Sequence, residues 1–175
     1  MSDSSKSTSL EPVKDGHGHD HYDPPFWKRY IFSTDHKVIG IQYGFTALAF
    51  LAFGFFLMMV MRWSIAYPTK AVPFLGGFEI FGLEVAVPWF DHWLTEDGTL
   101  TGDLYNMFGA MHGTIMIFLG IVPLAFGAFG NYVTPLQIGA PDMAFPRVNM
   151  ASFWFYFLGG VVMFGSFFVE SGAAK

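Results

Sequence analysis

Three long apolar runs constrain the fold of this chain more than any other feature. The first, from Val38 to Met61, contains 24 residues and no Asp, Glu, Lys, Arg or His. As a helix it would be about 36 Å long, enough to cross a hydrocarbon core of about 30 Å. Comparable runs cover 106–133 and 148–169. Because the alternation of a strand barrel is absent, we predict an all-α, polytopic membrane protein with transmembrane helices at 38–61, 106–133 and 148–169.

The composition narrows the class of protein further. Hydrophobic residues make up 53% of the chain and charged residues 13%, whereas soluble domains carry about 25% charged residues. The formal net charge of −5 gives no support for nucleic-acid binding. The chain has no cysteine, which excludes disulfides, iron–sulfur clusters and thiolate-bound zinc or copper within it.

The first 25 residues are polar and rich in Ser, Gly, His and Asp, and we predict a disordered tail at 1–25 followed by one membrane region at 26–175. His17, His19 and His21 alternate with small or acidic residues in this tail. Such a tract can bind transition metals weakly, but a solvated tail is the favoured interpretation.

Basic residues predict the orientation in the membrane. Lys28, Arg29 and Lys37 precede the first run, and Arg147 lies between the second and third. The loop at 62–103 holds two basic and six acidic residues. The positive-inside rule therefore places the N-terminus and the 134–147 loop inside, and the 62–103 loop outside.

His112 is the one charged or imidazole side chain within the second run. An ionisable ring inside a membrane is costly unless something binds it. Gly109 and Gly113 flank it and leave space beside the ring, as a planar haem with an axial histidine requires. The alternative is a histidine that hydrogen-bonds a neighbouring helix.

Two further features of the spans have structural alternatives. Gly113, Gly120 and Gly127 recur every seven residues, which predicts close helix packing on that face. Arg62 ends the first run; a snorkelling anchor is the favoured interpretation, and a donor to an anionic or carbonyl group of a cofactor is the alternative.

Polar residues gather near the membrane face that the charge bias assigns as inside. Asn131, Asp142 and Asn149 suit a water-filled proton entrance, in which the acid collects protons and the amides hold waters. The alternative is capping, with Asp142 in a turn and Asn149 starting the third helix. Upstream, Ser33, Thr34 and Asp35 are cap candidates for the first helix, and we assign His36 no catalytic role.

Several motifs resemble haem–copper oxidase subunit I. They are FSTDHKVIG, MHGTIMIF, GNYVTPLQIGAPDMAFPRVNMASFW and FFVESGAA, and the resemblance covers 32–174 except about 67–104. It implies that His112 is an axial ligand of the low-spin haem and that Arg62 contacts the formyl group of that haem. It also implies that Asp142 is the entrance acid of the D proton pathway, with Asn131 and Asn149 as its amides.

The resemblance also implies the function of the intact subunit. That function is oxidation of cytochrome c and reduction of oxygen to water with proton pumping, within a twelve-helix fold. Haem a is the expected low-spin haem. Copper B and a high-spin haem would be bound by the missing part of the subunit. The expected partners are cytochrome c, a copper-containing subunit II, other oxidase subunits and the lipid bilayer of a bacterial inner membrane or equivalent respiratory membrane.

This sequence departs from the family pattern in three ways. Ser64 replaces an acidic residue that helps to bind calcium or sodium in many members, which places that ion in doubt. Leu104 and Met107 stand where quinol-oxidising members carry polar residues, which favours cytochrome c as donor. Further haem and copper histidines are absent, so we expect a fragment, a split subunit or a truncated product. A quinol oxidase, an inactive remnant without haem and a structural helical subunit are the alternatives.

Overall fold

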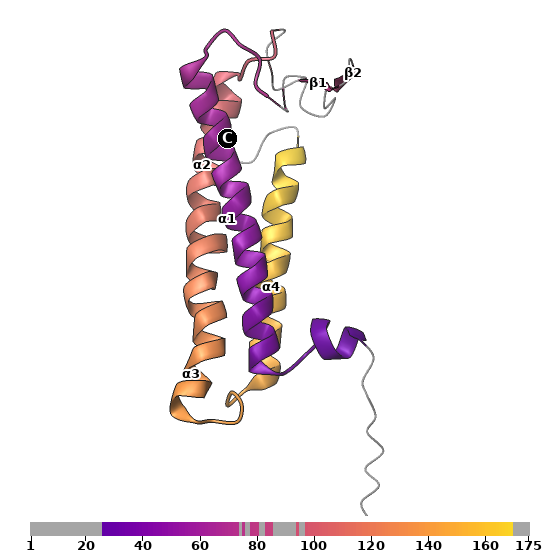
Figure 1. Ribbon diagram of the computed structural model, residues 1–175, viewed down its shortest axis with the longest axis vertical. Helices are drawn as coiled ribbons and strands as arrows, with labels where there is room; N and C mark the ends of the chain where they lie inside the picture. The colour runs from indigo at the N-terminus through magenta and orange to yellow at the C-terminus, as the bar shows by residue number, and fades with distance from the viewer. Residues whose placement is uncertain are drawn as a thin grey trace, which may run out of the picture.

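The computed structural model describes residues 26–73, 75, 78–80, 83–85, 94 and 97–169. Within them, three helices are long and apolar enough to cross a membrane: His36–Ala66, Gly102–Ile138 and Pro146–Phe168. They lie side by side as rods, with the first between the other two (Figure 1). The predicted all-α, polytopic fold is confirmed, whereas the tail at 1–25 lies outside the described residues.

Each span begins earlier or ends later than its apolar run, because the terminal turns include polar residues that a hydropathy count leaves out. The first span is one helix, α1 (His36–Ala66). The second comprises α2 (Gly102–Thr114), the π-helical segments η3 (Ile115–Ile121) and η4 (Pro123–Gly130), and α3 (Asn131–Ile138). The third comprises α4 (Pro146–Gly165) and η5 (Ser166–Phe168), and a short η1 (Trp27–Ile31) precedes α1.

The helix ends show which capping predictions are correct. Asp35 caps α1, because its side chain accepts a hydrogen bond from the Lys37 amide at 2.9 Å. Proline at the first position starts α4, and its N-cap residue, Phe145, makes no side-chain cap. Asn149 lies inside α4 rather than at its start, so its capping alternative is wrong.

The segment between α1 and α2 carries a short hairpin that the apolar runs did not predict. Strands β1 (Phe78–Ile80) and β2 (Leu83–Val85) pair antiparallel, with Phe78 opposite Val85 and Ile80 opposite Leu83. The hairpin lies at one end of the bundle, and η1 and the α3–α4 turn lie at the other (Figure 1). η1 and the α3–α4 turn therefore share one end of the bundle, and the assignment of that end to the inside stays a prediction.

A proline in the second span is compensated from α4. Pro123 has no N–H, so the Leu119 carbonyl, four residues earlier, cannot accept the i+4 bond of an α-helix, and the chain here forms the π-helical segments η3 and η4. The Tyr156 hydroxyl of α4 donates to this carbonyl at 2.7 Å. In lipid, where no water can replace a lost bond, this contact satisfies the Leu119 carbonyl and joins the second and third spans.

The recurrent glycines permit close packing, as predicted, at two of three positions. A Cβ at Gly120 would lie 2.5 Å from Leu51 Cδ2, and one at Gly127 would lie 2.5 Å from Tyr43 Cδ1. A Cβ at Gly113 would meet nothing within 4 Å. The first two glycines therefore bring the second span against α1, whereas Gly113 leaves open space next to His112.

Neighbouring glycines in α4 offer a matched test of this packing. A Cβ at Gly160 would lie 2.2 Å from Phe50 Cζ, whereas one at Gly159 would meet nothing within 4 Å. Both substitutions by alanine gain the same helix propensity. We expect Gly160→Ala to be less stable than Gly159→Ala by about 1–3 kcal/mol because it overpacks the α1–α4 contact. Unfolding of the purified protein in mixed micelles measures this difference; equal stability of the two variants would contradict the packing described.

Candidate functional site

His112 lies in the last turn of α2 and faces α1. Its Nδ1 is 2.8 Å from the carbonyl oxygen of Gly54. A carbonyl can only accept, so Nδ1 carries the proton and Nε2 of the neutral ring keeps a free lone pair. Metal-bound histidines are held in this way, with one nitrogen on a carbonyl and the other on the metal. The contact is also the helix–helix hydrogen bond of the alternative interpretation. The two interpretations are compatible, because Nδ1 makes the hydrogen bond and Nε2 is left for a metal.

The surroundings of His112 fit a planar macrocycle on one side. A Cβ at Gly113 would meet nothing within 4 Å, so this position is open, whereas one at Gly109 would be in van der Waals contact with Met61 Sδ at 3.8 Å. On the other side, Phe108, Met111 and Ile115 are buried in the apolar core. Among the described residues no cluster of three histidines or carboxylates could hold a bare metal ion. A haem iron needs only one axial side chain from this helix, and His112 fits that requirement.

Arg62 is exposed in the last turns of α1. It lies eight residues, or about 12 Å of helix, beyond Gly54, and within the described part of the chain its guanidinium has no polar partner. Ser64 in the next turn donates to the Met61 carbonyl at 2.8 Å, so its hydroxyl is used within its own helix.

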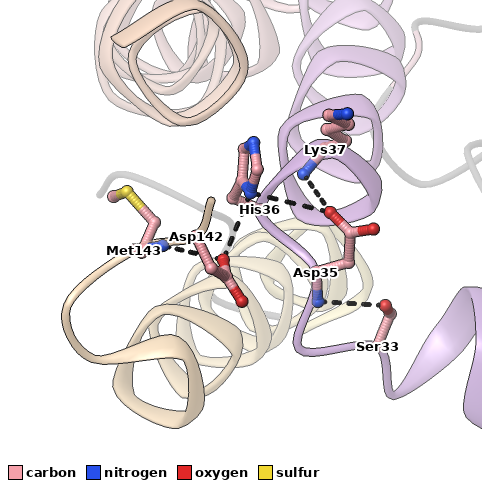
Figure 2. Close-up of polar contacts among 6 residues, drawn as sticks. All are labelled: Ser33, Asp35, His36, Lys37, Asp142 and Met143. Carbon is pink, nitrogen blue, oxygen red and sulfur yellow. Dashed lines mark hydrogen bonds and ion pairs between the residues drawn. The ribbon is translucent and has the colours of Figure 1, made fainter. Parts of the chain in front are cut away.

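The opposite end of the bundle holds a second group of polar residues, shown in Figure 2. His36 at the start of α1 is 3% exposed, and its Nδ1 is 3.2 Å from Asp142 Oδ1 in the α3–α4 turn. The same Asp142 oxygen accepts from the Met143 amide at 2.7 Å. Asp35 Oδ1 lies 3.7 Å from His36 Nδ1 on the other side. The ring is thus held between two carboxylates that remain open to solvent.

The other nitrogen of His36 points away from the carboxylates (Figure 2). Nε2 is buried and has no hydrogen-bond partner in the described part of the chain. A buried polar nitrogen without a protein partner is costly unless water reaches it. The His36 ring therefore has Nδ1 beside an exposed carboxylate and Nε2 in the buried interior.

A chain of hydrogen bonds lies deeper along the same helix. The Tyr43 hydroxyl is 3.1 Å from Ser152 Oγ, and Ser152 donates to the Asn149 carbonyl at 2.7 Å. The Asn149 side-chain Nδ2 is buried and without a partner among the described residues. These groups lie between α1 and the start of α4, so polar atoms extend inward from the end that carries Asp142.

Asn131 is placed differently from Asn149. It is 6% exposed at the start of α3, and its Nδ2 donates to the Gly127 carbonyl at 2.7 Å. One part of its amide is therefore used by its own helix, and Oδ1 remains as an acceptor. Among the described residues no hydrogen bond joins Asn131 to Asp142 or Asn149.

The sequence interpretation missed three members of this group: His36, Tyr43 and Ser152. His36 and Tyr43 are seven residues apart and share one helix face, which was a usable signal. Their partners lie more than a hundred residues away in the sequence. Without the tertiary fold, nothing in the sequence pairs them.

Leu104 and Met107, which the sequence analysis used to favour cytochrome c over quinol as the electron donor, lie in the apolar core. Leu104 is 0% exposed and Met107 is 3% exposed, and both pack in the cluster formed with Leu57 and Val60 of α1. They fill apolar space between the first two spans, and neither side chain is open to a ligand.

Together these features define an integral membrane protein with three span-capable helices in its described part, in which His112 faces α1 beside the open position at Gly113. Residues 38–175 match the family described as Cytochrome C and Quinol oxidase polypeptide I, and the chain belongs to this family. The family description includes enzymes with either donor.

Curated relatives agree with this assignment. The chain is 40% identical over 147 residues to cytochrome c oxidase subunit 1 of Thermostichus vulcanus, covering 82% of this chain and 22% of the relative. It is 37% identical over 158 residues to cytochrome c oxidase subunit 1 of Cereibacter sphaeroides, covering 89% and 28%. It is 39% identical over 145 residues to haem–copper oxidase subunit I+III of Aeropyrum pernix, covering 83% and 14%. The chain thus spans less than a third of the length of these relatives.

Proposed function

We propose that this chain forms the N-terminal part of the catalytic subunit of a cytochrome c oxidase and supplies one axial ligand of its low-spin haem. The observation that carries the proposal is the 2.8 Å contact of His112 Nδ1 with the Gly54 carbonyl, which leaves Nε2 as the free lone pair. The haem, with haem a as the expected type, would carry the electron. Gly113 leaves open space for the ring, and Arg62, exposed in the last turns of α1, would contact its formyl group.

The second part of the proposal is proton uptake at the inner surface. Asp142 is exposed and touches the buried ring of His36, and a hydrogen-bonded chain of Tyr43, Ser152 and Asn149 lies between α1 and α4. An exposed carboxylate collects protons, and polar groups such as the buried Asn149 Nδ2 would hold the waters that relay them. Asp142 would be the entrance acid, His36 its positioning partner, and Asn131 and Asn149 the amides of the pathway.

The remaining parts of the proposal concern partners and location. Copper B, the high-spin haem and the oxygen chemistry would be supplied by residues beyond this chain. Cytochrome c is the proposed donor, because Leu104 and Met107 are buried and apolar where a quinol-oxidising member is expected to be polar. A copper-containing subunit II and other oxidase subunits would be partners. The bundle would lie in a bacterial inner membrane or equivalent, with the N-terminus inside.

We expect His112→Ala, made in the complete oxidase complex, to abolish the low-spin haem signal, because no other described residue of this chain replaces the lost lone pair. The optical spectrum of the purified complex measures this. His36→Ala is the matched control, since it removes a buried histidine from the same chain and should leave that signal intact. A low-spin signal that survives His112→Ala would refute the ligand assignment and favour the alternative of a structural or inactive chain.

We expect Asp142→Asn to slow proton uptake roughly a hundredfold while the haem spectrum stays unchanged, since a positioned acid contributes about that much to proton transfer. Uptake is followed with a pH indicator during single turnovers. Asp35→Asn is the control: it removes the other carboxylate beside His36 but keeps a cap residue on α1. Equal slowing by the two variants would show that Asp142 has no special role.

We expect His36→Asn to slow proton uptake about fivefold at most, because a partly exposed pair contributes about 1 kcal/mol or less. In the double variant with Asp142→Asn, the effects should not add, since both residues act at one contact. The same single-turnover assay measures this. Independent, additive slowing would separate His36 from the entrance acid.

A further inference from the structure

We propose that Gly54 is a positioning residue for the haem ligand, because its carbonyl oxygen and its missing side chain together set the orientation and basicity of His112. This inference rests on the proposed haem ligation. The hydrogen-bond partner of His112 is then a backbone carbonyl of α1. The residue at this position matters because it has no side chain.

The packing around Gly54 explains why glycine is required there. Gly54 is buried, and a Cβ on it would lie 2.9 Å from Met116 Sδ and 3.1 Å from Met116 Cγ. Ile115 Cγ2 would be 3.5 Å away. Met116 follows His112 by four residues and so shares its helix face. The absence of a side chain at residue 54 therefore lets α1 approach this face closely enough for its carbonyl to reach Nδ1.

The carbonyl has the capacity for this second bond. Within α1 it is the normal acceptor for the amide four residues further on, and a carbonyl oxygen has two lone pairs. Its contact with His112 at 2.8 Å is within the range of a good N–H···O bond. The same bond fixes the tautomer and the ring plane, because a carbonyl cannot donate.

This bond also has an electronic consequence. A hydrogen bond from Nδ1–H to a carbonyl makes the imidazole a stronger base towards iron. A stronger axial base favours ferric over ferrous iron, so the bond lowers the midpoint potential of the haem. Gly54 would thus tune electron transfer without touching the haem.

The test is Gly54→Val in the complete oxidase complex, with redox titration of the low-spin haem. A valine pushes Met116 and the His112 turn away from α1, so the midpoint potential should rise. A tenfold loss of ferric relative to ferrous binding corresponds to about 59 mV for one electron. Ala52→Val is the matched control, since Ala52 is exposed on the opposite side of the same helix, two residues away.

A rescue separates this effect from general damage to the fold. Met116→Ala removes the two atoms that a Cβ at residue 54 would approach most closely and leaves Ile115 at ordinary contact distance, so Gly54→Val/Met116→Ala should return to the potential of Met116→Ala alone. Gly54→Ala, whose single added carbon displaces only the flexible end of Met116, should give a smaller rise and serves if the valine variant does not assemble.

The outcomes distinguish the two proposals. An unchanged potential in the Gly54 variants, or a rise that Met116→Ala does not reverse, would overturn the role of Gly54 and leave His112 as ligand. Retention of the low-spin signal in His112→Ala would overturn the ligation itself, and with it the basis of this inference.

Discussion

Every polar group inside a bilayer must find its partner within the protein, and the arrangement of these three spans follows from that requirement. The Leu119 carbonyl, which Pro123 deprives of an i+4 donor, accepts a hydrogen bond from Tyr156 of the neighbouring span. The His112 ring, costly in an apolar segment, is satisfied on one side by the Gly54 carbonyl. Each contact joins two spans. Polar groups that would destabilise an isolated helix in lipid therefore form the hydrogen bonds that align neighbouring helices.

Glycine makes these bonds geometrically attainable. Gly120 and Gly127 admit side chains of α1 at distances that a Cβ would not allow, and Gly54 admits Met116 in the reverse direction. Van der Waals packing replaces the hydrophobic effect as the driving force between helices in lipid. Each close approach therefore stabilises the association of two helices and fixes their relative position. Gly113 is the exception, because open space beside it serves the proposed haem rather than a neighbouring helix.

The sequence predicted the spans well because a charge-free run of this length is a strong physical signal. It offered Asp35 as one of three cap candidates for α1 and identified two packing glycines out of three, because caps and glycine repeats depend on local or periodic patterns. It did not predict the β1–β2 hairpin, since segments of three residues carry too little pattern. It also missed the pairing of His36 with Asp142, because a contact across 106 residues depends on how the helices fold back on each other. The alternative that Asn149 starts the third helix was wrong for a local reason, because α4 begins three residues earlier at Pro146.

The two proposed sites are linked through one helix. α1 carries His36 and Tyr43 at its first turns, Gly54 at its middle and Arg62 near its last turn. Eighteen residues separate His36 from Gly54, or about 27 Å along a helix, so protons would enter far from the haem that receives the electron. Because α1 is one uninterrupted helix, its register relative to the second span fixes both sites together. A change that slides α1 would therefore disturb the Gly54–His112 contact and the His36–Asp142 contact at once, whereas a change at either end would affect only one.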